Sequence, residues 1–249
     1  MFDLSGRVAL ITGAGQNIGR GIARALGERG AAVAVNDLEP QRATSVADEL
    51  SKSGIRAISI PFDVADHNEA KSAVAKISDQ LGPVDVLVNN AGIPSVMGIM
   101  PFRAESPERW MPFLAVNALG PMNCVHAVLP SMRATGWGRI ITISSSAHMG
   151  VDIGVSIYGA GKGAGVSFSR CIALEEAAAG ITSNAIALGL IRRDGGYGEL
   201  SEADVTAQIP VRRSGTPEEV GALCVYLASD EAGYMTAQTL NLNGGMMTS

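Results

Sequence analysis

The sequence predicts an α/β protein built on a doubly wound, mostly parallel β-sheet. Short apolar runs that suit buried strands alternate with longer amphipathic helical patterns over the whole chain, and this alternation places parallel strands between two layers of helices. The first apolar run leads through a glycine-rich turn into a helical pattern, which is the repeating unit of such sheets. We therefore expect one sheet with strand order 3-2-1-4-5-6-7 and helices on both faces.

The composition narrows the class of protein. A chain of 249 residues with 47% hydrophobic residues can bury one large core, so we expect a single domain over residues 1–249. The formal net charge of -5 argues against nucleic acid and anionic membranes as partners, because binding to phosphate groups needs a basic surface. The chain opens without a basic segment and a long apolar run, and no later stretch has eighteen uninterrupted apolar residues. We expect a cytoplasmic protein that binds no membrane.

The cysteines and histidines predict neither a disulfide framework nor a metal site. Cys124, Cys171 and Cys224 are far apart, odd in number and set among apolar helical residues, so we expect three buried thiols. The chain has three histidines, and no two of them are paired at metal-ligand spacing.

A strand, a glycine-rich turn and a helix open the chain. Arg7–Thr12 is a short apolar run, and a helical pattern extends over Ile18–Gly30. The turn between them, Gly13-Ala-Gly15-Gln-Asn17-Ile-Gly19, leaves room for a pyrophosphate and directs the free N–H groups and partial positive charge of the helix N-terminus at it. The predicted contacts are Gly13, Gln16, Asn17, Ile18 and Gly19.

The second strand, Ala31–Asn36, ends in an acid about 20 residues beyond the turn, as a dinucleotide-binding unit requires. Asp37 would accept hydrogen bonds from the adenosine ribose and repel a 2'-phosphate. Neither Gln16 nor Leu38 adds a positive charge, and the closest base, Arg42, falls in the following helix, so we expect NAD as the cofactor. The alternative for Asp37 is a turn or helix-cap aspartate before a helix over residues 41–53.

Two further strands end in residues that suit contact with a ligand. Ile58–Phe62 ends in Asp63 and Val64, and Val84–Val88 leads into Asn89-Asn90-Ala91-Gly92. Small residues at a strand end let the backbone approach a ligand closely. The alternatives are a helix N-cap at Asp63 and a tight turn that stabilises the sheet at Asn89–Gly92.

A candidate catalytic group lies at Ile140–Lys162, where an apolar strand ends in Ser144-Ser145-Ser146 and a helix opens near Tyr158. Tyr158 and Lys162 are four residues apart, which puts both side chains on one face of a helix, where the ammonium can lower the phenol pKa. Ser145 precedes the tyrosine by thirteen residues and stands at a strand end, where α/β sheets carry their chemistry. On their own, the tyrosine and lysine could equally be solvated residues of a surface helix.

In these motifs and their order the chain resembles the short-chain dehydrogenase/reductase family over essentially its whole length. The resemblance implies a Rossmann fold, a catalytic set of Ser145, Tyr158, Lys162 and Asn117, and reversible hydride transfer between nicotinamide and a secondary alcohol or ketone. Asn117 would kink its helix and hold a water that connects the lysine to solvent. A homotetramer is the assembly implied. The cofactor contacts beyond the first turn are then Asp37, Leu38, Asp63, Val64, Asn90, Ala91, Gly92, Tyr158, Lys162, Gly189 and Ile191.

The chain departs from the family pattern at three places. Asn17 replaces the middle glycine of the first turn, and since asparagine tolerates the left-handed region we expect the turn to survive with an added hydrogen bond. Leu188 replaces the proline of the family segment that ends here at Gly189. Arg193 stands where relatives have a threonine that touches the nicotinamide carboxamide.

The C-terminal third of the chain carries the predicted substrate loop and the last two elements. The loop covers residues about 188–212 and includes Gly195-Gly-Tyr-Gly198, which suits a segment that closes over the substrate or an ordinary surface loop. Ser214–Val220 begins a capped helix, and Thr239–Gly245 supplies the last strand and turn.

The predicted substrate pocket is mostly apolar. Plausible apolar lining comes from Met97, Met100, Phe102, Ala147, His148, Met149, Val151, Val155 and Tyr197. The closest general likeness is to 3-oxoacyl-(acyl carrier protein) reductases, which dock an acidic carrier through basic residues at positions that are Gly136 and Ala179 here. We therefore expect a small free ketone or alcohol as substrate, with Arg192-Arg193 and Arg212-Arg213 either holding an anionic group or solvated at the surface. Alternatives are carrier-bound 3-oxoacyl reduction and a catalytically idle dinucleotide-binding module.

Overall fold

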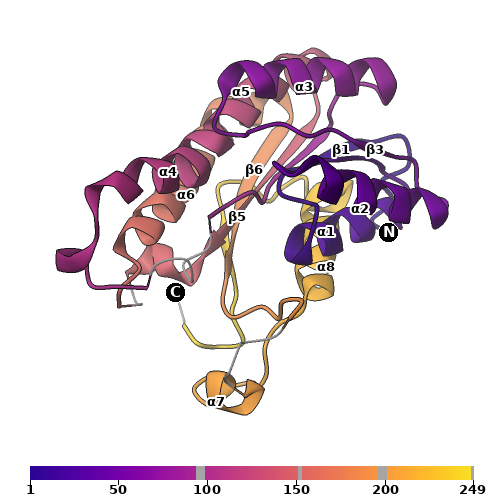
Figure 1. The fold of residues 1–249 in the computed structure, drawn as a ribbon. Coiled ribbons are helices and arrows are strands. Elements are labelled where there is room, and N and C mark those ends of the chain that lie inside the picture. The colour runs from indigo at the N-terminus through magenta and orange to yellow at the C-terminus, as the bar shows by residue number, and fades with distance from the viewer. Residues whose placement is uncertain (94–98, 151–152, 196–200, 248–249) are drawn as a thin grey trace.

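The computed structural model describes residues 1–93, 99–150, 153–195 and 201–247, and within them one seven-stranded sheet forms the centre of the molecule (Figure 1). Its strand order is β3-β2-β1-β4-β5-β6-β7, as the sequence predicts, and every neighbouring pair of strands is parallel. The strands are β1 (Val8–Ile11), β2 (Ala32–Val35), β3 (Ala57–Ser59), β4 (Val86–Asn89), β5 (Gly138–Ser145), β6 (Ile181–Leu188) and β7 (Thr239–Leu242).

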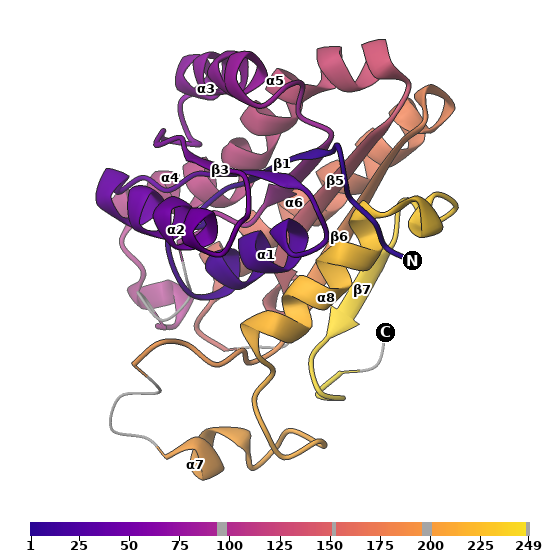
Figure 2. The same cartoon turned by 90° about the vertical axis from the view of Figure 1, so that its right-hand side faces the viewer.

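Helices cover both faces of this sheet (Figures 1 and 2). One layer contains α1, α2 and α8, and the other contains α3, α5 and α6. The α-helices are α1 (Asn17–Gly27), α2 (Pro40–Lys52), α3 (His67–Gln80), α4 (Trp110–Leu114), α5 (Gly120–Thr135), α6 (Ser156–Glu176), α7 (Glu202–Thr206) and α8 (Pro217–Ala228). Shorter helical turns are η2 (Phe102–Ala104), η3 (Pro107–Arg109), η4 (Ala115–Leu119), η5 (Ser146–Met149), η6 (Ala177–Ala179) and η7 (Asp230–Ala232).

Along each strand the side chains alternate between the two helix layers, because successive side chains of a strand point to opposite faces of the sheet. In β1, Val8 and Leu10 pack with the core under α3 and α5, whereas Ala9 and Ile11 pack with the core under α1 and α8. Both faces of the central strands are therefore buried, which explains why they read as continuous apolar runs in the sequence.

Capping chemistry sets several helix starts. Thr216 accepts a hydrogen bond from the N–H of Glu219, whose carboxylate accepts one from the N–H of Thr216, so the expected cap of α8 is a capping box. Asp66 caps α3 by accepting from the N–H groups of Asn68 and Glu69. The N-cap residue of this helix is therefore Asp66, and the helix-cap alternative for Asp63 is wrong.

The helical segment before β5 is irregular around Asn117, where the family resemblance implies a kink. Residues Ala115–Leu119 form a π-helical turn, η4, between α4 and α5. The whole stretch Pro107–Thr135 is long and apolar enough to cross a bilayer by length and composition alone. It packs against α3 and α6 within the α/β core, and a core helix of this kind passes the same test, so the finding is weak support for a membrane span.

The cysteine prediction is correct at two of three positions. Cys124 and Cys224 are fully buried, and burial raises the pKa of the Cys124 thiol to about 12. Cys171 is exposed on α6, contrary to the prediction. Its apolar sequence neighbours point in other directions around the helix, because adjacent residues of a helix do not share a face.

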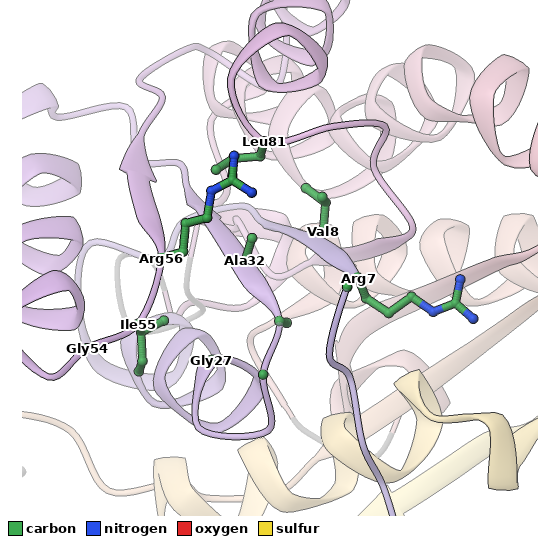
Figure 3. A pocket seen from close by; sticks show the side chains of 11 residues that line it. Arg7, Val8, Gly27, Ala32, Gly54, Ile55, Arg56 and Leu81 are labelled. Atoms are coloured by element: carbon green, nitrogen blue, oxygen red, sulfur yellow. The ribbon is translucent and has the colours of Figure 1, made fainter.

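A small cavity of about 270 Å³ lies at the amino ends of β1 and β2 (Figure 3). The segments that lead into β1, β2 and β3 line it, and the side chains of Arg7 and Arg56 extend away from each other. Arg7 stacks on Trp137, with its guanidinium 3.5 Å from the ring centre, and Arg56 donates to the carbonyl of Gln80. Both arginines are thus already engaged in holding the turns together at the end of the sheet opposite the site described next.

Candidate functional site

A cavity of about 860 Å³ opens at the carboxyl ends of the strands, where open α/β sheets bind their ligands. Every cofactor contact predicted from the sequence lines it. These residues are Gly13, Gln16, Asn17, Ile18, Gly19, Asp37, Leu38, Asp63, Val64, Asn90, Ala91, Gly92, Tyr158, Lys162, Gly189 and Ile191. Strand ends from both halves of the sheet therefore contribute to a single cavity.

The glycine-rich turn presents the N-terminus of α1 to this cavity. Asn17, the first residue of α1, adopts φ 46°, so the turn keeps the left-handed conformation with asparagine in place of glycine. The preceding Gln16 makes no side-chain cap, and the first turn of the helix carries no acid. The free N–H groups and positive end of the helix dipole thus suit an anionic group in the cavity.

Close backbone packing explains the glycine at position 19. A Cβ atom there would lie 2.3 Å from the carbonyl oxygen of Gly13 and 2.6 Å from Nδ2 of Asn90. Asn90 in turn donates from Nδ2 to the carbonyls of Thr12 and Gly13. The turn, the start of α1 and the end of β4 are therefore held in one arrangement, and only glycine fits at Gly19.

Two polar side chains that the sequence reasoning did not single out fix the strand ends around the turn. The hydroxyl of Thr12 accepts from the N–H groups of Asn90 and Ala91, both at 3.0 Å, and so joins β1 to β4. Asn36 accepts from the N–H of Gly13 and donates to the carbonyl of Phe62. The sequence feature that could have identified both residues is a polar side chain at the end of a buried strand.

The two asparagines after β4 differ in their contacts. The side chain of the second, Asn90, makes the bonds to the turn. Both side-chain polar atoms of Asn89 are buried without a hydrogen-bond partner among the described residues. The structural role thus belongs to Asn90, while its backbone and that of Ala91 line the cavity.

Asp37 is buried at the end of β2, where its carboxylate accepts from the N–H of Gly15 and from that of Glu39, both at 3.1 Å. It therefore acts as a turn residue and lines the cavity as well. The sequence predicts Arg42 in the following helix, at a distance from this strand end. In the structure Arg42 lines the same cavity, and a Cβ atom added to Gly15 would lie 2.5 Å from the Cβ of Arg42. An acid and a base consequently share the part of the cavity beside β2.

Lys162 of α6 is buried, and its ammonium donates to the carbonyl of Ile143 in β5 at 2.9 Å. Burial lowers the pKa of Lys162 to about 8, because desolvation disfavours the charged form. Its Nζ lies 5.9 Å from the ring centre of Tyr158. The helical spacing thus brings the cation and the phenol ring together as predicted.

Ser145, at the end of β5, lines the cavity together with Tyr158 and Lys162. Its hydroxyl oxygen accepts from the N–H of Ala147 at 3.2 Å, which begins the short turn η5. Ring nitrogen Nδ1 of His148 lies 2.7 Å from the carbonyl oxygen of Ser145 and fixes the backbone there. This geometry leaves the hydroxyl proton of Ser145 able to donate to a bound oxygen.

Asn117 lies behind the cavity wall rather than in it. A Cβ on Gly92 would meet Oδ1 of Asn117 at 2.8 Å and Nζ of Lys162 at 3.1 Å, so the two polar groups flank the same glycine. Asn117 Nδ2 donates to the carbonyl of Ile93, and Oδ1 is buried without a partner among the described residues. A buried acceptor of this kind requires a donor, and its position beside the lysine fits the predicted relay.

The predicted substrate lining is only partly correct. Val155 lines the cavity, whereas Met100, Phe102, Ala147, His148 and Met149 do not. Phe102 instead stacks on Trp110, with ring centres 5.6 Å apart. Met97, Val151 and Tyr197 lie outside the described residues, as does most of the run Gly195–Gly198. Lining residues that the sequence reasoning missed include Ile93, Ile99, Ile153, Leu190 and Met246.

These features fit a nicotinamide dinucleotide. The uncapped helix N-terminus suits its phosphates, Asp37 suits a ribose, and the cavity continues past Gly92 to Ser145, Tyr158 and Lys162. Such a group would be held by the sixteen lining residues named above.

Comparisons with known proteins identify the family of this chain. The family model described as enoyl-(acyl carrier protein) reductase matches residues 13–247. Nodulation protein G of Azospirillum brasilense is 38% identical to this chain, and the match covers 98% of this chain and 99% of that protein. A 3-oxoacyl-[acyl-carrier-protein] reductase of Staphylococcus aureus is 37% identical, and the match covers 96% of this chain and 97% of that protein. A gluconate 5-dehydrogenase from Burkholderia cenocepacia J2315, solved with NADP and tartrate, superposes with a TM-score of 0.91 at 33% identity over 98% of this chain and 96% of that one. The chain therefore belongs to the short-chain dehydrogenase/reductase family of oxidoreductases and resembles its 3-oxoacyl-(acyl carrier protein) reductase-like members.

Proposed function

We propose that this protein interconverts a secondary alcohol and a ketone by hydride transfer with NAD(H). The observation that carries the proposal is the convergence of Ser145, Tyr158 and Lys162 on the cavity that also contains the glycine-rich turn. A catalytically idle binding module would have no need of a buried lysine beside a tyrosine, because burying an ammonium costs free energy.

Each catalytic residue then has a separate task. The hydroxyl of Ser145 donates to the substrate oxygen, and the phenol of Tyr158 gives that oxygen a proton in reduction or takes one in oxidation. The Lys162 ammonium stabilises the phenolate and holds the nicotinamide ribose, while Asn117 extends the proton path behind Gly92. The bound dinucleotide supplies the hydride chemistry.

NAD(H) is the cofactor we propose, because the carboxylate of Asp37 lines the cavity at the end of β2, where it would accept from the adenosine ribose and repel a 2'-phosphate. Arg42 lines the same region and would favour NADP(H), as would analogy with the Burkholderia enzyme, which was solved with NADP. We give Asp37 precedence because it is buried, fixed by two N–H groups and close to the turn, whereas Arg42 is exposed. The test is the ratio of kcat/KM for the two cofactors, and comparable values would reject the proposal.

A small free ketone or secondary alcohol is the substrate we propose. The carrier-docking positions of the similar reductases are occupied here by Gly136, which ends α5 with φ 67°, and by Ala179 of η6, so neither supplies a charge. Losing both cations weakens attraction to an acidic carrier protein. We also propose a homotetramer, as the family resemblance implies, and a cytoplasmic location, as the sequence predicts.

A side-by-side assay distinguishes activity on a small free substrate from the alternative hypothesis, the reduction of 3-oxoacyl groups on a carrier protein. The enzyme is assayed with acetoacetyl-carrier protein and with a panel of free ketones and alcohols by absorbance of NADH. We expect the higher kcat/KM on a free substrate. A markedly higher value on the carrier-bound substrate would establish the alternative hypothesis, and no turnover of any substrate despite tight NADH binding would favour the idle module.

A further inference from the structure

The loop after β6 is joined to the glycine-rich turn by a side chain that the family pattern lacks. Oδ1 of Asn17 accepts a hydrogen bond of 2.8 Å from the backbone N–H of Asp194. A glycine at position 17 could adopt the same backbone conformation but could not form this bond. The residue next to Asp194 is therefore held beside the N-terminus of α1.

That residue is Arg193, which stands where the family has a threonine. Arg193 lines the 860 Å³ cavity and is half-buried, and within the described residues its guanidinium has neither a hydrogen bond nor an ion pair. An arginine that lines a cavity and is partly withdrawn from water favours an anionic ligand there.

The other arginines of the two basic pairs are placed differently. Arg192 is exposed and does not line the cavity. Arg212 donates to the carbonyl of Ala207, and Arg213 forms a two-pronged pair with Glu219. The sequence left open whether each of these four arginines binds an anion or is solvated. Of the four, Arg193 lines the cavity and the other three do not.

We propose that Arg193 binds the pyrophosphate of the dinucleotide, and that the hydrogen bond from Asp194 to Asn17 positions it there. This inference rests on the proposed function, because it takes the dinucleotide to occupy the cavity. A substrate carboxylate is the competing anion. The phosphates are favoured because the attachment of Asp194 is to the first residue of α1, the helix end at which a pyrophosphate binds.

The test measures binding rather than turnover. ADP-ribose carries the pyrophosphate but no nicotinamide, and its Kd is measured by titration calorimetry for the wild type, Arg193→Met, Asn17→Gly and the control Arg192→Met. Methionine keeps most of the length of the side chain and removes its charge. Thermal unfolding of each protein without ligand verifies the fold.

Arg193→Met should weaken ADP-ribose binding by about tenfold or more, as expected for the loss of a charge-assisted hydrogen bond. It should also make the dependence of Kd on salt less steep, whereas Arg192→Met should leave Kd within about twofold. Asn17→Gly should weaken binding by a smaller factor. In the double variant Arg193→Met/Asn17→Gly, ADP-ribose binding should be weakened by less than the product of the two single factors, because both substitutions disturb one contact.

The outcomes separate the inference from the proposed function. If the wild type binds ADP-ribose and Arg193→Met binds it equally well, the inference is wrong while the proposed function stands. If that variant keeps its ADP-ribose affinity but raises KM for an anionic substrate, Arg193 recognises substrate and the inference is likewise wrong. Failure of the wild type to bind either ADP-ribose or NADH rejects both.

Discussion

The ammonium of Lys162 donates to the carbonyl oxygen of Ile143 across 2.9 Å, joining the catalytic helix α6 to the strand that ends in Ser145. The cation is buried, and within the described part of the chain it forms no ion pair with a carboxylate. Its burial lowers the pKa of Lys162 from 10.5 to about 8, so the folded protein binds the proton less tightly than the unfolded chain does.

Lys162→Met should therefore stabilise the protein without cofactor at pH 7. Because the folded-state pKa is the lower one, the destabilisation by the lysine is complete below about pH 8 and disappears as the pH rises towards 10.5. The shift corresponds to about 3 kcal/mol at neutral pH. Urea unfolding at pH 7 and pH 10 should show a gain that shrinks at the higher pH, while Lys76→Met on the exposed face of α3 should show none. Equal gains at both pH values would contradict the assignment.

Tyr158→Phe should abolish turnover and spare cofactor binding. The substitution removes only the hydroxyl, and loss of a general acid/base costs at least about a hundredfold in rate. Lys162→Ala should damage both kcat and the affinity for NADH, since the ammonium serves phenol and ribose. Steady-state kinetics and NADH fluorescence titration separate the two effects. Retention of most of the wild-type rate by Tyr158→Phe would show that another group transfers the proton.

Asp37→Ala should narrow the preference for NAD(H) over NADP(H), because it removes the charge that repels a 2'-phosphate. Asp37→Asn is the sharper variant, since its amide oxygen can still accept from the N–H of Gly15. Arg42→Ala should act in the opposite direction and lower kcat/KM with NADP(H). The measurement is kcat/KM for both cofactors with each variant. An unchanged ratio in both Asp37 variants would remove this residue from cofactor selection.

Gly19→Ala should disrupt the cofactor site, since the new Cβ would lie 2.3 Å from the carbonyl oxygen of Gly13. We expect lower thermal stability and loss of NADH binding. Gly163→Ala in α6 is the matched control, because the nearest atom to its Cβ, the carbonyl oxygen of His148, is 3.9 Å away. Alanine replaces glycine inside a helix there and should stabilise by about 0.5–1 kcal/mol. Similar NADH affinity in the two variants would mean that the turn can move aside.

The parts of the site that the sequence predicted are those fixed by local geometry. A four-residue helical spacing brings Lys162 to Tyr158, and asparagine keeps the left-handed turn at Asn17, so both follow from neighbouring residues. Sheet order and the lining of the cavity by strand ends follow from the alternation of strands and helices. The roles of the lining residues remain predictions.

What the sequence could not predict depends on contacts between distant segments. Arg42 was placed in the right helix, but its approach to Gly15 requires the packing of α2 beside the first turn. Ile99 and Met246 reach one cavity from the middle and the C-terminal end of the chain, whereas Phe102 packs on Trp110 instead. Cys171 shows the same limit within one helix, since its exposure depends on which face of α6 meets the sheet.

The π-helical turn at Ala115–Leu119 makes the spacing of its segment as important as its composition. A π-turn holds one residue more than an α-helical turn, so the helix before it and the helix after it are rotated relative to an unbroken α-helix. Deleting one residue near Asn117 would restore regular helix and turn either the apolar face of α4 or that of α5 out of the core. Homologues that keep the site should therefore tolerate exchanges of side chains in this segment far better than insertions or deletions, which alter its phase.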